Sequence, residues 1–114
     1  MAAGRLLVIA PDNDLRRSLV FALEAEGYEV TVRADLPDYS WLARQRFDAT
    51  VLDQKALTGA DYASIAFCVK AYPVVLLAAH AHPWLVQWVT DVVEMPVLGN
   101  AISASVRRAM HSEA

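Results

Sequence analysis

The sequence has little cysteine and little glycine, and each shortage argues against particular kinds of protein. Cys68 is the single cysteine among 114 residues, so no disulfide can form within the chain. A reducing, cytoplasmic compartment is therefore expected. Only four glycines are present, and none lies between Ala10 and Asn13, where a phosphate-binding loop would follow the first expected strand. This argues against a glycine-rich nucleotide site.

The chain also lacks an excess of basic residues. Ten Lys and Arg residues against thirteen Asp and Glu residues give a net charge of −3, so a nucleic-acid partner bound through a basic surface is not expected. The stretch 71–90 contains no Asp, Glu, Lys or Arg, but Pro73 and Pro83 interrupt it. Because a membrane-spanning helix needs about 20 continuous apolar residues, no membrane span is expected. The N-terminus lacks the layout of a signal peptide.

The hydrophobic fraction of 56% is enough for a substantial core in a single domain spanning 1–114. Apolar runs predict strands at 5–10, 28–32, 49–52, 74–77 and 92–93. Residues at helical spacing predict helices within 15–26, 38–46, 62–69, 83–89 and 102–110. Five strands alternating with five helices indicate an α/β protein with a flavodoxin-like, doubly wound, five-stranded parallel sheet. Sites in such sheets lie beyond the carboxyl ends of the strands.

Several segments resemble one known family. Residues 8–12, Val-Ile-Ala-Pro-Asp, run into Leu-Arg-Arg-Ser-Leu at 15–19, and 24–30 is Glu-Ala-Glu-Gly-Tyr-Glu-Val. Phe47-Asp48 stand shortly before 51–53, Val-Leu-Asp, and Met95-Pro96 precede the last expected helix. Over about residues 6–110 the chain resembles the receiver domains of response regulators, which act in bacterial two-component signal transduction and phosphorelays. The resemblance implies that Asp53 stands at the phospho-acceptor position.

The other functional positions of that family are replaced here. Receivers place two acidic residues after the first strand, Ser or Thr after the fourth, and Lys before a proline after the fifth. The matching residues are, in that order, Ala10, Pro11, Ala78 and Met95. Mg²⁺ usually takes one or two carboxylates, and phosphoryl transfer needs charge neutralisation at the equatorial oxygens. The resemblance therefore implies a degenerate pseudo-receiver without normal Mg²⁺-dependent phosphorylation. Asp12 follows the replaced pair and could approach Asp53, but its place before the first helix predicts an N-cap instead.

Two features of chain geometry also follow from the resemblance. The stretches from Asp53 to Ala78 and from Ala78 to Met95 are each several residues shorter than in receivers. The third and fourth helices are therefore expected to be shortened or displaced. The Met95–Pro96 peptide bond is expected to be cis, a state found in about 5–6% of such bonds in folded proteins.

Three further residues could carry chemistry, but each has a structural interpretation. His80 and His82 could bind zinc, yet such a site generally needs three or four ligands, and no Cys, Asp or Glu lies close in sequence. His82 could instead cap the helix that begins at Pro83. Cys68 is expected to be a structural thiol within an apolar helix. No metal site and no cofactor is expected.

The aromatic segment 83–89 is the best candidate for an interaction surface. Leu85, Val86 and Val89 form a helical stripe that is expected to cover the sheet. Trp84 and Trp88 lie four residues apart on the other side of this helix, although a short, shifted helix could bury one or both indoles. In receivers the fourth helix, fifth strand and fifth helix form the usual partner surface. The expected surface consists of Trp84, Gln87 and Trp88, with Ser103 and Arg107 as a polar rim.

The sequence thus predicts a non-enzymatic pseudo-receiver, a protein-interaction module that binds a protein partner or a second copy as a homodimer. Two alternatives remain open. Asp53 could be a phospho-acceptor with degraded kinetics, which would place the chain in a two-component system as a weakly active receiver. The flavodoxin-like fold could instead bind a small molecule, although the missing glycine loop counts against this.

Overall fold

The five expected strands form one parallel sheet. The computed structural model describes residues 3–57, 61–95 and 99–111. The strands are β1 (Gly4–Ile9), β2 (Tyr28–Arg33), β3 (Ala49–Asp53), β4 (Val74–Ala78) and β5 (Asp91–Glu94), in the spatial order β2-β1-β3-β4-β5. Each neighbouring pair is parallel. The predicted doubly wound, flavodoxin-like fold class is therefore confirmed.

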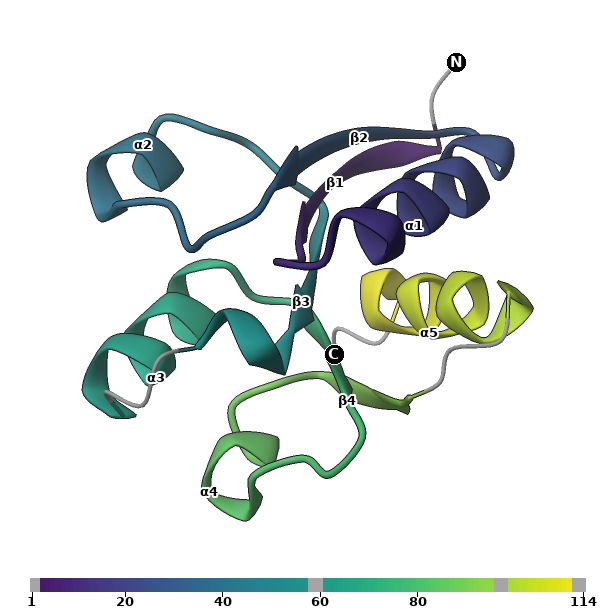
Figure 1. Cartoon of the computed structure of the whole chain (residues 1–114). Coiled ribbons are helices and arrows are strands. Elements are labelled where there is room, and N and C mark those ends of the chain that lie inside the picture. The colour runs from purple at the N-terminus through teal and green to yellow at the C-terminus, as the bar shows by residue number, and fades with distance from the viewer. Residues whose placement is uncertain (1–2, 58–60, 96–98, 112–114) are drawn as a thin grey trace.

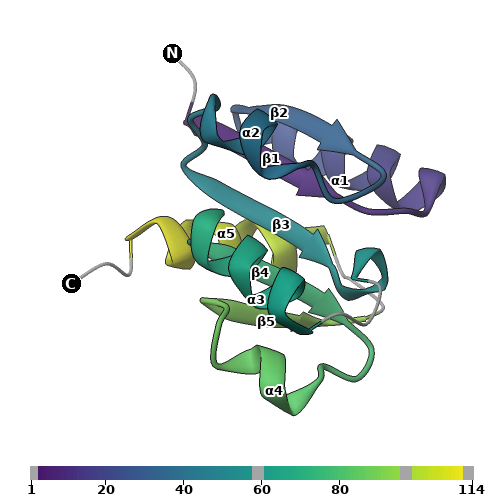
Figure 2. The same cartoon turned by 90° about the vertical axis from the view of Figure 1, so that its left-hand side faces the viewer.

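Helices cover both faces of the sheet. They are α1 (Asn13–Ala25), α2 (Tyr39–Ala43), the 3₁₀ helix η1 (Gln54–Ala56), α3 (Asp61–Lys70), α4 (Pro83–Val86) and α5 (Gly99–His111). The helices α1 and α5 lie on one face, whereas α2 and α3 lie on the other (Figure 1). Beyond the β5 edge of the sheet lies α4 (Figure 2). It has four residues, in agreement with the expected shortening, whereas α3 has ten.

The alternation of side chains along the strands divides the core into two clusters. Leu6 and Val8 of β1 pack with α1 and α5 on one face. Leu7 and Ile9 pack with residues of α2, α3 and α4 on the other. Every residue of β3 and β4 is buried, as expected for central parallel strands that are covered on both sides.

The ends of α1 follow from local chemistry. The Asp12 carboxylate accepts hydrogen bonds from the backbone N–H groups of Asp14 and Leu15, at 2.8 and 3.1 Å. The predicted N-cap is therefore confirmed. After the helix, Gly27 has a φ angle of +94°, a conformation that glycine adopts without the steric cost of a Cβ atom.

Two helices bury sides that differ from the pattern in the sequence. Tyr62 and Val69 belong to the stripe whose spacing predicts α3, yet they are 91% and 57% exposed, and Phe67 is buried instead. Both sides of this helix are apolar, so periodicity indicates the helix without showing which side meets the sheet. In α4 the prediction that Val86 covers the sheet is wrong. The helix ends after one turn, which leaves Val86 43% exposed and Leu85 buried.

Asp91 ties the edge strand β5 to α5. Its carboxylate accepts hydrogen bonds from Ser105 Oγ at 2.7 Å and Arg108 Nη2 at 2.6 Å. Burial alone would raise the pKa of Asp91, but hydrogen bonds from Ser105, Arg108 and the Val92 N–H, with the Arg108 charge, hold it below its usual value. The carboxylate is therefore charged at neutral pH and holds the strand against the helix.

Two further expectations concern a cis bond and a membrane span. The cis peptide bond among the described residues is Tyr72–Pro73. The Met95–Pro96 bond, for which the cis state is expected, lies outside the described residues. Across residues 3–57, 61–95 and 99–111, no helix is both long enough and apolar enough to cross a membrane.

The two-sided burial of β3 predicts a large cost for truncating one of its side chains. Leu52 is fully buried in the cluster under α2 and α3. We expect Leu52→Ala to lower the free energy of unfolding by about 2–5 kcal/mol, because it leaves a cavity. Phe21→Ala, at a 78% exposed position, is the matched control and should change it by less than about 0.5 kcal/mol. Urea denaturation of both variants measures the difference, and equal costs would contradict the described core.

Candidate functional site

The sheet brings four of the five sequence-predicted site residues to one edge. Asp53 ends β3 beside Leu77 of β4, and Ala78 ends β4. Ala10 follows Ile9, which pairs with Leu52, so it lies at the same edge as Asp53. The Met95 N–H donates to the Ala78 carbonyl at 3.1 Å, which places Met95 beyond β5 at this edge as well. Pro11 follows Ala10 and is exposed.

Asp53 is held by the turn that follows it. The residue is only 3% exposed, and its Oδ1 accepts a hydrogen bond from the Lys55 backbone N–H at 3.0 Å. The carboxylate thereby caps η1 and satisfies a free N–H group at the start of that turn. Among the described residues, Asp53 takes part in no ion pair. Its observed contact is thus one that a structural cap would make.

At the positions that match the reactive groups of receivers, the side chains near Asp53 offer no oxygen ligand. Ala10 and Ala78 are buried and end in methyl groups, and Met95 packs its thioether against the α1–α5 core. Asp53 would offer a divalent cation one side-chain carboxylate here, the smallest number that Mg²⁺ usually takes. Within the described ranges, no three His, Cys, Asp or Glu residues come together as a metal site.

Arg16 places a cation at the loop after β1, and the sequence analysis missed this. Its Nη1 donates to the carbonyl oxygens of Ala10 and Pro11, both at 2.9 Å, and its Nη2 donates to Asn13 Oδ1 at 3.0 Å. The two residues that match the acidic pair of receivers therefore have their carbonyl groups occupied by a guanidinium. A positive charge fixed here disfavours a second cation. The spacing of Arg16 from the loop, about one helical turn into α1, is the signal that could have revealed it.

Gln54, directly after Asp53, connects two loops. Its Nε2 donates to the His80 carbonyl at 3.0 Å, and its Oε1 accepts from the His82 N–H at 2.9 Å. One side-chain amide therefore satisfies the backbone on both sides of Ala81, in the loop between β4 and α4. This loop leads into the aromatic segment, so Gln54 fixes the position of α4 relative to Asp53.

The remaining candidate residues have structural environments. The ring of His82 stacks on Trp84, with centroids 5.7 Å apart, and its side chain makes no capping hydrogen bond to α4. His80 is exposed. Cys68 is fully buried, and desolvation raises the pKa of its thiol to about 11. The thiol is therefore neutral at physiological pH and unsuited to nucleophilic attack.

The aromatic segment is only partly exposed. Trp84 is half-buried against the α2–α3 side of the core, whereas Trp88 is 36% exposed. Gln87 is exposed, and its Nε2 donates to the Trp84 carbonyl at 3.4 Å. We call the exposed residues Val86, Gln87 and Trp88 the α4 surface. It is smaller than the sequence predicts, because Trp84 contributes mainly to the core.

The prediction that Ser103 and Arg107 form a polar rim of this surface is wrong. Ser103 is 6% exposed, because it lies on the side of α5 that packs on the sheet beside the buried Ile102 and Val106. Arg107 is exposed but turns toward α1, where its Nη2 lies 3.4 Å from Glu26 Oε1. Neither residue therefore borders the aromatic segment. Helical spacing predicts α5 but does not show where the flanks of its buried side lie.

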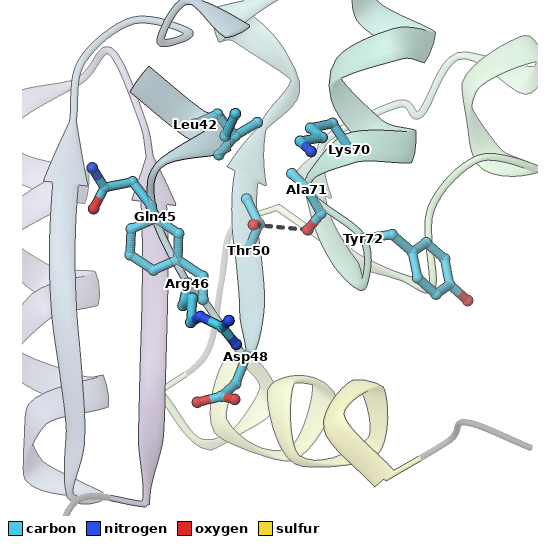
Figure 3. A pocket seen from close by; sticks show the side chains of 10 residues that line it. Leu42, Gln45, Arg46, Asp48, Thr50, Lys70, Ala71 and Tyr72 are labelled. Carbon is cyan, nitrogen blue, oxygen red and sulfur yellow. Dashed lines mark hydrogen bonds between the residues drawn. The ribbon is translucent and has the colours of Figure 1, made fainter. Parts of the chain in front are cut away.

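A cleft of about 360 Å³ lies at the opposite, amino end of β3 and β4. Its lining includes Leu42, Arg46, Asp48 and Thr50, and the Thr50 hydroxyl donates to the Ala71 carbonyl at 3.0 Å (Figure 3). The Lys70 ammonium, also at its wall, lies 5.2 Å from the centre of the Tyr39 ring. Thr50 and Lys70 therefore contact neighbouring groups of the protein.

Solved structures of receiver domains have this fold. The non-phosphorylated HemR receiver domain from Leptospira biflexa matches with a TM-score of 0.77 at 21% identity, over 96% of each chain. The chemotaxis response regulator CheY4 of Vibrio cholerae matches with a TM-score of 0.74 at 21% identity, over 96% of this chain and 98% of that chain. Full-length FixJ from B. japonicum gives 0.76 at 21% identity, over 98% of this chain and 62% of FixJ.

No protein-family profile and no curated protein sequence matches the chain. The likeness at these identities concerns the arrangement of the backbone. It defines the class of structure, and the fold of this chain is that of a response-regulator receiver domain.

The described site predicts how the protein responds to Mg²⁺. We expect no saturable binding below about 1 mM, because neither Ala10 nor Pro11 adds a carboxylate to that of Asp53 and Arg16 occupies their carbonyl groups. Titration followed by NMR or tryptophan fluorescence measures it. Asp53→Asn should leave the titration unchanged. This variant should also keep its free energy of unfolding within about 1 kcal/mol, since the amide oxygen can accept the same Lys55 hydrogen bond. A sub-millimolar site lost in Asp53→Asn would overturn this expectation.

Proposed function

We propose that this chain is a pseudo-receiver, a non-enzymatic protein-interaction module of bacterial-type signal transduction that acts without Mg²⁺-dependent phosphorylation. One observation carries the proposal. Of the five positions at this edge of the sheet that match the reactive groups of receivers, that of Asp53 alone holds a carboxylate, and Ala10 and Ala78 present buried methyl groups. The lone buried cysteine is in keeping with a cytoplasmic protein.

Each missing group would have served a different step of phosphoryl transfer. Ala10 and Pro11 stand where receivers have the two carboxylates that would hold the metal. A hydroxyl that would contact a phosphoryl oxygen is absent at Ala78, and an ammonium that would neutralise its charge is absent at Met95. Loss of a single transition-state donor typically costs about 10²–10³ in rate. Asp53 at the acceptor position is the observation that favours the alternative, a phospho-acceptor with degraded kinetics.

Without this chemistry, function resides on surfaces, and the α4 surface is the candidate for a protein partner. Trp88 offers a large, rigid contact area with few rotatable bonds. Gln54 holds the loop that leads to this surface through two backbone hydrogen bonds. The surface is therefore presented in one position, which lowers the entropy cost of binding.

Restoring the missing groups tests the chemical half of the proposal. The restored variant combines Ala10→Asp, Pro11→Asp, Ala78→Thr and Met95→Lys. We expect it to bind beryllofluoride in the presence of Mg²⁺ and to accept phosphate from acetyl phosphate at least about 100-fold faster than the wild type. Mass spectrometry and ¹⁹F NMR measure both. The same variant with Asp53→Asn is the control and should do neither. Uptake by the wild-type protein would instead establish the phospho-acceptor alternative.

The interaction half is tested at Trp88. Pull-down from the native cell, followed by affinity measurement with the captured partner, should show that Trp88→Ala weakens binding by about 30-fold, the effect of a hot-spot residue. Phe21→Ala, an aromatic truncation at an exposed position of α1, is the control and should bind normally, as should Asp53→Asn. Unchanged affinity of the Trp88→Ala variant would place the partner elsewhere.

A further inference from the structure

The strand β2 forms one edge of the sheet, and among the described residues it pairs with β1 alone. The Arg33 carbonyl accepts a hydrogen bond from the Ala10 N–H at 3.1 Å, so the backbone groups of Arg33 face β1. These groups alternate in direction along a strand. Those of Thr31 therefore also face β1, whereas those of Val30 and Val32 face outward. Figure 2 shows β2 as the uppermost strand, with the rest of the sheet below it.

The side chains of β2 do not prevent another strand from pairing with this edge. The strand contains neither proline nor lysine, the residues that commonly protect an exposed edge. Glu29, Thr31 and Arg33 lie on the side of the sheet that faces α2, with opposite charges at the ends of this set. Val30 and Val32 lie on the α1 side, where Val32 is 42% exposed.

The two charged side chains of β2 remain available for a partner. The guanidinium carbon of Arg33 lies 4.8 Å from the centre of the Trp41 ring, and its Nε is buried without a hydrogen-bond partner. Among the described residues, Arg33 takes part in no ion pair. Glu29 Oε1 lies 3.8 Å from Arg5 Nε, but its side chain is 68% exposed. A guanidinium that stacks on an indole can still bind a carboxylate in its own plane.

We propose that the β2 edge binds the β2 edge of a second copy of this chain, antiparallel, about a two-fold axis at Thr31. Thr31 then faces its own equivalent. Val30 faces Val32, and because the backbone groups of both point outward, these two exchange both hydrogen bonds of an antiparallel pair. Glu29 faces Arg33 in a pair without backbone hydrogen bonds, where facing side chains lie closest. The edge is thus complementary to itself, as a two-fold interface requires.

The charges favour this register over its neighbour. An axis at Val30 would also bring outward backbone groups together. Glu29 would then face Thr31, and Arg33 would face Gly27, so neither charge would gain a partner. With the axis at Thr31, the second copy supplies a carboxylate to each Arg33 and a guanidinium to each Glu29. This charge complementarity identifies the second copy as the occupant of the edge.

The opposite edge of the sheet is unsuited to the same pairing. The charged residues of β5 are Asp91 and Glu94, so a second copy at this edge would bring only carboxylates together. The helix α4 also lies beyond β5 (Figure 2). Self-pairing is therefore expected at β2 and not at β5.

The β2 interface is separate from the α4 surface, because α4 lies beyond the other edge of the sheet. A dimer therefore leaves Trp88 free for a partner. Pairing of two short strands buries an area at the lower end of specific interfaces, so the dissociation constant is expected to be on the order of 10–100 µM. The inference does not depend on whether Asp53 is phosphorylated.

A charge-swap experiment tests the register. Sedimentation equilibrium, from low micromolar to about 500 µM protein, should show a reversible wild-type dimer. Glu29→Arg and Arg33→Glu each place like charges in the facing pairs and should weaken self-association at least about tenfold. An equimolar mixture of the two variants should associate again, because every facing pair then holds opposite charges. Glu94→Arg, the same substitution at an exposed position of β5, is the matched control and should leave the dimer intact.

Cross-linking at the two-fold axis gives a second measurement. In a facing pair without backbone hydrogen bonds the Cα atoms lie about 4.5 Å apart, within reach of a disulfide. Thr31→Cys should therefore form a disulfide-linked dimer at least about tenfold faster than Glu29→Cys, whose equivalent lies about 13 Å away along the strand. Cys68 is fully buried and does not compete. Electrophoresis without reductant measures both rates.

Circular dichroism and the unfolding midpoint show whether each variant is folded. If Arg33→Glu fails to fold because it loses the contact with Trp41, Glu29→Arg and the cross-linking rates decide alone. A wild-type protein that stays monomeric at the highest concentration would overturn the proposal. So would folded charge variants that associate normally, a mixture that fails to associate, dissociation by Glu94→Arg, or equal cross-linking rates. None of these results bears on partner binding at Trp88, so the proposed function stands or falls by its own tests.

Discussion

The structure depends on the burial of β3 from both sides. This strand pairs with β1 and β4, and its side chains belong alternately to the two halves of the core. Its last residue, Asp53, is therefore carried to a fixed point at the carboxyl edge of the sheet and is almost fully enclosed there. A carboxylate in that place must be solvated by the protein. The turn at Lys55 provides one hydrogen-bond donor for it.

The side chains at the carboxyl edge of the sheet determine the local charge there. Mg²⁺-dependent phosphorylation, as in receiver domains, would need several negatively charged side chains close together. Here Ala10 and Pro11 remove two of them, and Arg16 adds a positive one whose donors are already used by carbonyl oxygens. Arg16 thus brings a positive charge to the edge of the sheet at which β3 ends in the Asp53 carboxylate.

Most of the fold could be predicted from the sequence, because buried strands and capped helices have short-range signals. Apolar runs gave the five strands, and Asp12 gave the start of α1. Which side of α3 is buried could not be predicted, because both sides are apolar and only packing decides. The roles of Ser103, Arg107 and Gln54 likewise depend on packing against residues distant in the chain, for which spacing carries no information, whereas the role of Arg16 could have been found from its spacing to the loop after β1. The four replaced positions came from the family resemblance and were brought together by the sheet, apart from the exposed Pro11.

The amide of Gln54 binds only main-chain atoms of the β4–α4 loop. Its hold on that loop is therefore indifferent to which side chains occupy positions 80 to 82, provided that the backbone keeps its course. Substitutions in the loop and in the short helix beyond it can accumulate without loosening the attachment. The side chains around Trp88 can thus change while the position of this surface on the domain stays constant.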